Sequence, residues 1–254
     1  MADNDYVNPY DDSRGDDLLE QAEFPDNTET RCPVVLCLDI SGSMNGPAID
    51  EVNQGLQMLG EAWRKDKLAS KRVEVALVTF GGGVSVLDLR TGSGEPIDPD
   101  PYQAFVTPDY MRVPMLTAGG DTPMGNAVRI AVQLLTGRKE IYKQAGADYN
   151  RPQLYLFTDG HPTDPDWESG AQALRQEEER RGVSVWPFGV EGADFAKLSR
   201  FARRRPVRIP NNVGQFQEFF EWLSKSVAAV ANSGEGANQV AAPGLATGWD
   251  VIEL

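Results

Sequence analysis

One short stretch of the sequence constrains the fold more than any other. Residues 34–38 are all apolar, and an acid, two serines and a glycine follow within the next five positions. A short apolar run that ends in turn-forming residues is typical of a strand buried on both faces, as in a parallel sheet. In open α/β sheets, ligands bind at the edge where such strands end. The sequence therefore predicts an α/β protein whose site begins at Asp39, Ser41 and Ser43.

These three side chains share one chemical property: each offers oxygen, and none offers sulfur or nitrogen. Hard divalent cations such as Mg²⁺ prefer oxygen ligands. The spacing therefore predicts a metal site at the end of the first strand. The alternative is that Asp39 and Ser41 only cap the following helix and brace its loop, since acids and serines are common helix caps.

Two later segments have the same character. Residues 119–125 read Gly-Gly-Asp-Thr-Pro-Met-Gly, and residues 157–160 read Phe-Thr-Asp-Gly. Together with Asp-x-Ser-x-Ser at 39–43, they resemble the metal-ion-dependent adhesion site of von Willebrand factor A (VWA) domains. The resemblance covers residues 31–231 and implies a doubly wound, Rossmann-like α/β fold. It also implies five metal-binding residues: Asp39, Ser41, Ser43, Thr122 and Asp159.

The resemblance further implies what such a site does. In the family these residues hold a divalent ion, here expected to be Mg²⁺ with Mn²⁺ or Ca²⁺ as alternatives, and one position stays open for an Asp or Glu of another protein. Two carboxylates balance the charge of the ion, while hydroxyls and waters leave it electrophilic. Asp121, which lies between the glycines and Thr122, is a further acid that could compete for the ion.

Residues 31–34 and 158–164 are most similar to the cytosolic bacterial tellurium-resistance (TerY-type) group of this family. That finer resemblance implies a stress-response or defence setting, beside a protein kinase and a phosphatase. We therefore expect a cytoplasmic adaptor that is not an enzyme. One alternative is a VWA subunit of an AAA-type or chelatase-like ATPase complex. Another is that Asp250, Glu253 or a rim acid of the same chain fills the site.

Charge and composition divide the chain into three parts. Residues 1–30 contain ten acids and one arginine, and they supply most of the net charge of −14. We expect this part to be a disordered acidic tail. The VWA domain follows at 31–231, and residues 232–254 read as a flexible linker that ends in an apolar peptide around Trp249. That peptide either docks on a partner as an added strand or folds back on its own domain.

Hydrophobic periodicity predicts a mostly parallel sheet of six strands, with helices on both faces. The expected strands are 34–38, 73–80, 84–89, 154–158, 183–190 and 207–210. The third should be an antiparallel edge strand, because only four residues join it to the second. The expected helices lie at 49–63, 123–135, 164–181, 194–203 and 216–230, the third capped by Asp164. The Gly- and Pro-rich segment 91–117 is expected along the rim of the site.

Other classes of function lack support in the sequence. Neither a Walker A motif nor Gly-x-Gly-x-x-Gly follows a strand, and the only histidine, His161, has no recognisable nucleophile partner. The arginine cluster at 200–208 favours a solvated surface, or a patch that receives the acidic tail, over nucleic-acid binding. Cys32 and Cys37 would lie about 16 Å apart on a strand, too far for a disulfide. Free thiols suit the cytosol, and we expect neither a membrane span nor a signal peptide.

Overall fold

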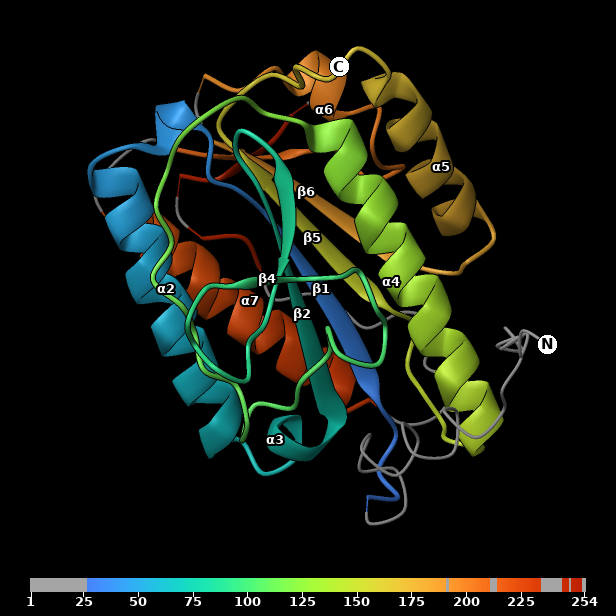
Figure 1. Ribbon diagram of the computed structural model, residues 1–254. Coiled ribbons are helices and arrows are strands. Elements are labelled where there is room, and N and C mark those ends of the chain that lie inside the picture. Colours follow the sequence, from blue (N-terminus) through green and yellow to red (C-terminus); the bar gives the residue numbers. More distant parts are fainter. Residues whose placement is uncertain (1–26, 191, 211–213, 234–243, 247, 253–254) are drawn as a thin grey trace, which may run out of the picture.

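The computed structural model describes residues 27–190, 192–210, 214–233, 244–246 and 248–252. Within these ranges the strands form one eight-stranded sheet in the order β4-β3-β2-β1-β5-β6-β7-β8 (Figure 1). The strands are β1 (Cys32–Asp39), β2 (Val73–Phe80), β3 (Val84–Leu87), β4 (Pro96–Ile97), β5 (Gln153–Thr158), β6 (Ser184–Val190), β7 (Val207–Ile209) and β8 (Asp250–Val251). The predicted mostly parallel α/β sheet is confirmed.

The central strand is the predicted one. All eight residues of β1 are buried, and β1 pairs in parallel with both β2 and β5. Its two cysteines, Cys32 and Cys37, are buried and free. A strand covered on both faces needs apolar residues at every position, which is why the sequence shows an unbroken apolar run there rather than an alternating one.

The edges of the sheet differ from the prediction. The third strand, β3, is antiparallel to β2 as expected. Two further strands pair in antiparallel fashion, β4 with β3 and β8 with β7, and each contains only two residues. The predicted six strands with one antiparallel edge therefore become, among the residues described, eight strands with three antiparallel pairings, and only β3 and β8 run against the direction of the others. A two-residue strand is too short to leave a hydrophobic period in the sequence.

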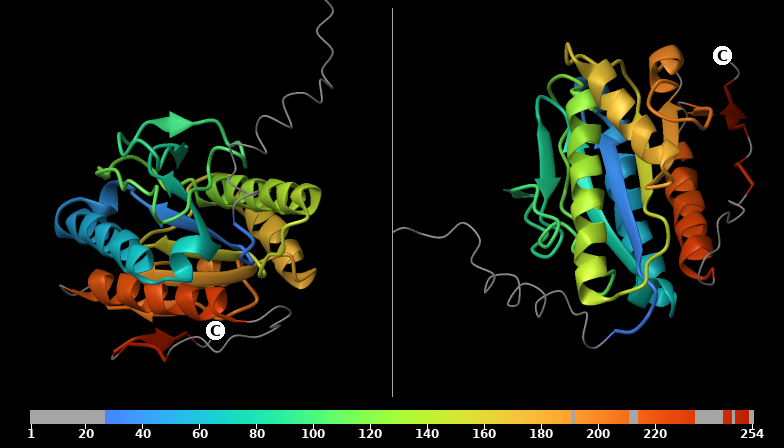
Figure 2. Two further views of the ribbon diagram at one scale, coloured as in Figure 1. Left: turned by 90° about the horizontal axis from the view of Figure 1, so that it is seen from below. Right: turned by 90° about the vertical axis from the view of Figure 1, so that its right-hand side faces the viewer.

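Helices cover both faces, as predicted. On one face lie α2 (Pro47–Lys65), α3 (Ala69–Arg72) and α7 (Gln215–Ala231); on the other lie α4 (Met124–Ala145) and α5 (Trp167–Glu179) (Figures 1 and 2). A short helix, α6 (Phe195–Leu198), follows β6. Alternate residues of β1 enter the two cores: Val34, Leu36 and Leu38 pack in one, and Val35 and Cys37 in the other.

The start of α5 corrects one prediction. Asp164 was expected to cap this helix, but α5 begins at Trp167 and the carboxylate of Asp164 lies elsewhere. It accepts hydrogen bonds from the backbone N–H groups of Gly125 (3.2 Å) and Asn126 (2.9 Å), at the start of α4. The sequence identified the capping residue, because acids satisfy the free N–H groups of a first helical turn. It could not show that a different helix was capped.

The segment 91–117 also differs from its predicted place. Most of it lies away from the site. Val106 exchanges backbone hydrogen bonds of 2.9 and 3.0 Å with Val75, in the N-terminal half of β2. Further on, Leu116 bonds in both directions to the side chain of Asn53 in α2. The segment thus covers a part of β2 that would otherwise be an open strand edge. Only the residues that follow it reach the site.

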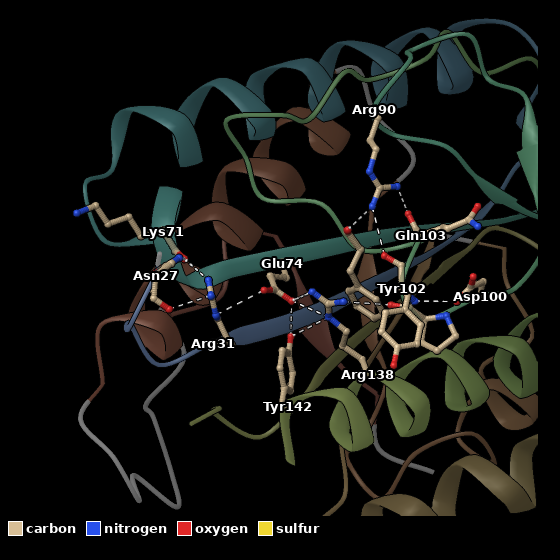
Figure 3. Close-up of polar contacts among 12 residues, drawn as sticks. Asn27, Arg31, Lys71, Glu74, Arg90, Asp100, Tyr102, Gln103, Arg138 and Tyr142 are labelled. Carbon is tan, nitrogen blue, oxygen red and sulfur yellow. Dashed lines mark hydrogen bonds and ion pairs between the residues drawn. The ribbon is translucent and has the colours of Figure 1, made fainter. Parts of the chain in front are cut away.

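A buried charge network lies near the start of β2, at the end of the sheet away from Asp39 (Figure 3). Glu74, near the start of β2, lies 2.6 Å from Nη2 of Arg138 and 3.7 Å from Nε of Arg31. The hydroxyl of Tyr142 donates a 2.5 Å hydrogen bond to the same carboxylate. Burial, followed by the charge of Glu74, raises the pKa of Tyr142 well above its usual value. Arg138 also donates to the carbonyl of Pro101, so the network anchors segment 91–117.

The C-terminal peptide folds back on its own domain, which is one of the two predicted alternatives. Trp249 is 6 % exposed and packs against the rings of Phe188, Phe219 and Trp222. Its indole Nε1 donates to the side chain of Gln215 at 2.9 Å. The following strand, β8, lies beside β7 and is drawn in red in Figure 2. Segment 234–243, which was predicted to be a linker, lies outside the described residues.

Residues just before β1 contact the end of α3. Glu29 forms an ion pair with Arg72 at 2.7 Å, and the amide of Asn27 donates to the carbonyl of Lys71. The remainder of the predicted acidic tail, 1–26, lies outside the described residues. Among the residues described, no helix combines the length and the apolar character needed to cross a membrane.

Candidate metal site

Three loops at one edge of the sheet bring the five predicted residues together. Asp39 is the last residue of β1, and Ser41 and Ser43 follow in the turn toward α2. Asp159 directly follows β5. Thr122 lies just before α4. A Cβ built on Gly160 would lie 3.4 Å from Thr122 Oγ1 and 3.8 Å from Asp39 Oδ2, so both oxygens border the same space at Gly160. Their assignment as metal ligands remains a prediction.

A chain of hydrogen bonds links the two carboxylates. Asp39 Oδ1 accepts from the backbone N–H of Ser41 at 2.8 Å. The hydroxyls of Ser41 and Ser43 are 3.1 Å apart, and Ser43 donates to Asp159 Oδ1 at 2.8 Å. Ser41 therefore bonds to Asp39, and Ser43 bonds to Asp159. The oxygens of the loop after β1 and of the loop after β5 thus lie within one polar cluster.

The interior of the cluster is shielded from water. Asp39 is 0 % exposed, Ser41 2 % and Thr122 6 %, whereas Ser43 is exposed and Asp159 is half-buried. Burial raises the pKa of Asp39 to about 6, although hydrogen bonds from Ser41 and Thr158 oppose that shift; the nearby charge of Asp159 adds to it. Burial also raises the pKa of Asp159. Both shifts reflect the cost of holding negative charge where water cannot solvate it.

The residues present fit a hard divalent cation. Within the part of the chain that the structure describes, no lysine or arginine forms an ion pair with Asp39 or Asp159. A buried carboxylate without a cationic partner is costly, and a metal ion would remove that cost. The donors are two carboxylates and three hydroxyls, a set that suits Mg²⁺. The described residues include no cluster of three or more His, Cys, Asp and Glu that could hold a metal ion, so a cation at this site would need the hydroxyl oxygens as well as the two carboxylates.

Thr158 belongs to this cluster although it was not among the predicted residues. The buried hydroxyl of Thr158 donates a 2.5 Å hydrogen bond to Asp39 Oδ2 and accepts one from the N–H of Gly160 at 3.1 Å. A signal for it was present. β1 and β5 pair in parallel with Leu38 opposite Phe157, so Thr158 comes next to Asp39. Assuming that β1 and β5 are adjacent would have been enough to place this hydroxyl.

Two rim residues singled out in the sequence have other contacts. The side chain of Asp121 is exposed, and its backbone carbonyl accepts from Gly82 N–H at 2.9 Å. His161 is also exposed, and its Nδ1 lies 3.1 Å from Asp194 Oδ2. Partial burial opposes the downward shift in the pKa of Asp194, but the N–H of Lys197 and the His161 ring together lower it. His161 thus pairs with an acid at the rim.

The arginine cluster at 200–208 contacts the chain's own residues. The guanidinium of Arg204 lies 3.3 Å from the ring centroid of Trp186, and Arg208 forms an ion pair with Asp250 at 2.7 Å. One of the two predicted uses of this cluster was a patch for the acidic N-terminal tail. Residues 1–26 of that tail lie outside the described residues, so this use stays a prediction; among the described residues, Asp250 and Glu178 are acids that contact the cluster.

Solved structures share this fold. The chain is similar to a von Willebrand factor type A protein from Catenulispora acidiphila, with a TM-score of 0.53 and 18% identity over 79% of this chain and 43% of that one. It is similar to human COPII-coat protein Sec24c, with a TM-score of 0.54 and 13% identity over 81% and 34%. The open form of the pilus adhesin SpaC from Lactobacillus rhamnosus GG gives 0.50 and 12% over 79% and 31%.

This chain therefore spans less than half of each of these three structures, and the low identities show a shared fold alone. No curated protein is similar enough in sequence to count as a match. The family profile described as "von Willebrand factor type A domain" matches residues 34–222, from β1 into α7. Because that match covers well over half of the sequence, the chain belongs to the von Willebrand factor type A domain family.

Proposed function

We propose that this chain is a metal-dependent protein-interaction module and not an enzyme. Asp39, Ser41, Ser43, Thr122 and Asp159 would hold Mg²⁺, and a partner protein would supply an Asp or Glu. The observation that carries the proposal is the buried carboxylate of Asp39, which lies in an all-oxygen cluster and forms no ion pair among the described residues. When bound, Mg²⁺ supplies an electrophilic centre that keeps some coordination positions for water or an incoming carboxylate.

Hydrogen bonds from neighbouring residues orient the two carboxylates that would balance the charge of the ion. Asp39 is oriented at both oxygens, by Ser41 N–H and by the hydroxyl of Thr158. Asp159 is oriented through Ser43. Only two of the five donors carry negative charge, so the set neutralises a divalent ion without making the site anionic. Such a site can still attract a carboxylate from outside. Mn²⁺ and Ca²⁺ are the alternative occupants.

The kind of partner is proposed by analogy. SpaC is named a pilus adhesin and Sec24c a COPII-coat protein, and both names describe proteins that bind or assemble. Residues 31–34 and 158–164 favour the cytosolic bacterial tellurium-resistance group, so we propose a stress-response or defence setting with a kinase or phosphatase as partner. A complex with an AAA-type ATPase is the alternative.

Calorimetric titration with Mg²⁺, and then Mn²⁺, tests the metal site. We expect saturable binding by the wild-type chain and its loss in Asp39→Ala and Thr122→Ala. The matched control is Asp109→Ala, which removes an exposed acid of segment 91–117 and should bind as the wild type does. Absence of binding by the wild-type chain, or undiminished binding by Asp39→Ala, would contradict the proposal.

A second experiment tests what the site captures. We expect one discrete protein to bind the immobilised chain in Mg²⁺ but not in EDTA, and to be lost with Asp39→Ala. Co-purification of an ATPase whose turnover changes when this chain is added would favour the ATPase-complex alternative. Phosphatase or nuclease activity of the purified chain would contradict the non-enzymatic role.

A further inference from the structure

We infer that the turn between β2 and β3, residues 81–83, is a fourth loop of the metal site, in which Gly81 and Gly82 position Thr122. The inference rests on the proposed function, because it assigns these glycines a part in holding a threonine of that site. Neither glycine offers a side chain to a metal. Both act through the backbone that precedes Thr122.

Backbone hydrogen bonds join this turn to two of the predicted loops. Gly82 N–H donates to the carbonyl of Asp121, the residue immediately before Thr122, at 2.9 Å. Three more bonds connect the first strand, the β2 end and the threonine loop: Ile40 N–H to Phe80 C=O (2.9 Å), Gly119 N–H to Ile40 C=O (2.7 Å) and Gly42 N–H to Gly120 C=O (2.9 Å). The three segments therefore form one backbone junction.

The junction is too tight for side chains. A Cβ built on Gly81 would lie 2.5 Å from the carbonyl oxygen of Ile40 and 2.8 Å from that of Gly119. A Cβ on Gly120 would lie 2.2 Å from the Cα of Gly82, and Gly120 also has a φ of +74°. Real Cβ atoms do not approach backbone this closely, so the two turns can meet only where both carry glycine.

The third glycine of the same turn lies outside the contact. A Cβ on Gly83 would meet nothing within 4 Å, and its φ is not in the left-handed region. Gly82 is intermediate: its Cβ would be 3.4 Å from Gly120 Cα, an ordinary contact, but its φ is +68°. Three adjacent and chemically identical residues therefore differ in what they do. This difference supplies matched variants.

Thr122 is held from its other side as well. Its N–H donates to the hydroxyl of Thr163 at 3.0 Å, and its carbonyl accepts from Thr163 N–H at 2.9 Å. With Thr163 bonded on one flank and Gly82 bonded to the preceding residue on the other, the backbone of Thr122 is held from both sides, and its hydroxyl borders the same space at Gly160 as Asp39 Oδ2. A displaced β2–β3 turn would release one flank and move that hydroxyl away from the carboxylate.

Hydrogen exchange of the full chain in EDTA tests the junction without any metal. In Gly81→Ala we expect the amides of Gly42 and Gly119 to exchange about tenfold faster or more, while amides of β5 keep their wild-type rates. Gly83→Ala should exchange as the wild type does. If Gly81→Ala does not fold, Gly82→Ala carries the same test, because it adds backbone strain without a severe clash.

Calorimetry with Mg²⁺ then measures the consequence for the site. We expect Gly81→Ala to bind Mg²⁺ about 10- to 100-fold more weakly, the loss typical when a group that orients a ligand is removed. Gly83→Ala should retain wild-type affinity. Unchanged exchange at Gly42 and Gly119 in both Gly81→Ala and Gly82→Ala would overturn the inference, as would faster exchange spread equally over β5. If the wild-type chain binds no Mg²⁺, the proposed function fails, and the exchange experiment still decides the role of the turn.

Discussion

The hydroxyl of Thr158 donates a 2.5 Å hydrogen bond to Asp39 Oδ2, across two adjacent parallel strands that are buried. Ser41 N–H holds the other oxygen of the same carboxylate at 2.8 Å. Both oxygens are thus oriented by the chain itself. This arrangement makes Asp39 the rigid centre of the candidate site.

We predict that Thr158→Val weakens Mg²⁺ binding about 10- to 100-fold, because the orienting hydrogen bond is lost while the shape of the side chain is nearly kept. Thr158→Ser retains the hydroxyl and should restore most of the affinity. Calorimetry on the three proteins checks this. Equal affinity in the valine and serine variants would mean that the hydroxyl only fills space.

We predict that the metal-free domain loses stability as the pH rises from about 4 to about 6. The folded pKa of Asp39 is raised to about 6 from an ordinary value of 3.8, so the folded state binds more protons than the unfolded state in this window. Stability then falls with pH, by an amount on the order of 3 kcal/mol, and levels off above the window. Urea unfolding in EDTA at several pH values measures it.

Asp39→Asn is the control for that experiment, since it cannot ionise and should remove most of the slope between pH 4 and 6. A wild-type curve that is flat, or that rises through this window, would show that the carboxyl of Asp39 is not held in its neutral form by burial.

We predict that Glu74→Gln lowers the free energy of unfolding by about 3–5 kcal/mol, because it leaves the buried guanidinium groups of Arg31 and Arg138 without their carboxylate. The control is Glu61→Gln, which removes an exposed ion pair with Lys65 and should cost less than about 1 kcal/mol. Chemical denaturation of both variants gives the two values. Similar small losses would show that the buried network contributes little.

We predict that Trp249→Ala destabilises the domain by about 3–5 kcal/mol, the usual cost of removing a large buried ring. The ring packs in the aromatic cluster with Phe188 and Trp222, so its loss leaves a cavity. Val251→Ala, two residues further along in β8 and 46% exposed, should change stability by less than about 1 kcal/mol. Thermal unfolding of the two variants distinguishes a packed C-terminal strand from a loosely held one.

Local patterns were enough to predict the features that depend on neighbouring residues. The predicted strand 73–80 matches β2, and the spacing of Asp39, Ser41 and Ser43 identified the edge of the sheet where the cluster lies. Both rest on periodicity or on a fixed turn, and the sequence records these directly. The positions of Thr122 and Asp159 followed from the family resemblance and not from a pattern in the residues.

Features that depend on distant contacts could not be predicted in this way. Asp164 carries the composition of a helix cap, but only the packing of two helices decides that it caps α4. Glu74 appears in the sequence as one acid inside an apolar strand, and its two arginine partners lie far along the chain in either direction. The two-residue strands β4 and β8 are formed by pairing with strands that are already in the sheet, β3 and β7.

The Asp164 cap has a consequence for how a partner would be received. This acid belongs to the loop after β5, yet it fastens the first turn of the helix that follows Thr122. The loop that carries Thr122 and the loop after β5 therefore cannot shift independently of each other. An approaching protein would meet loops already fixed relative to each other, and its association rate should be set by collision and orientation, about 10⁵–10⁷ M⁻¹s⁻¹, without a slower rearrangement step.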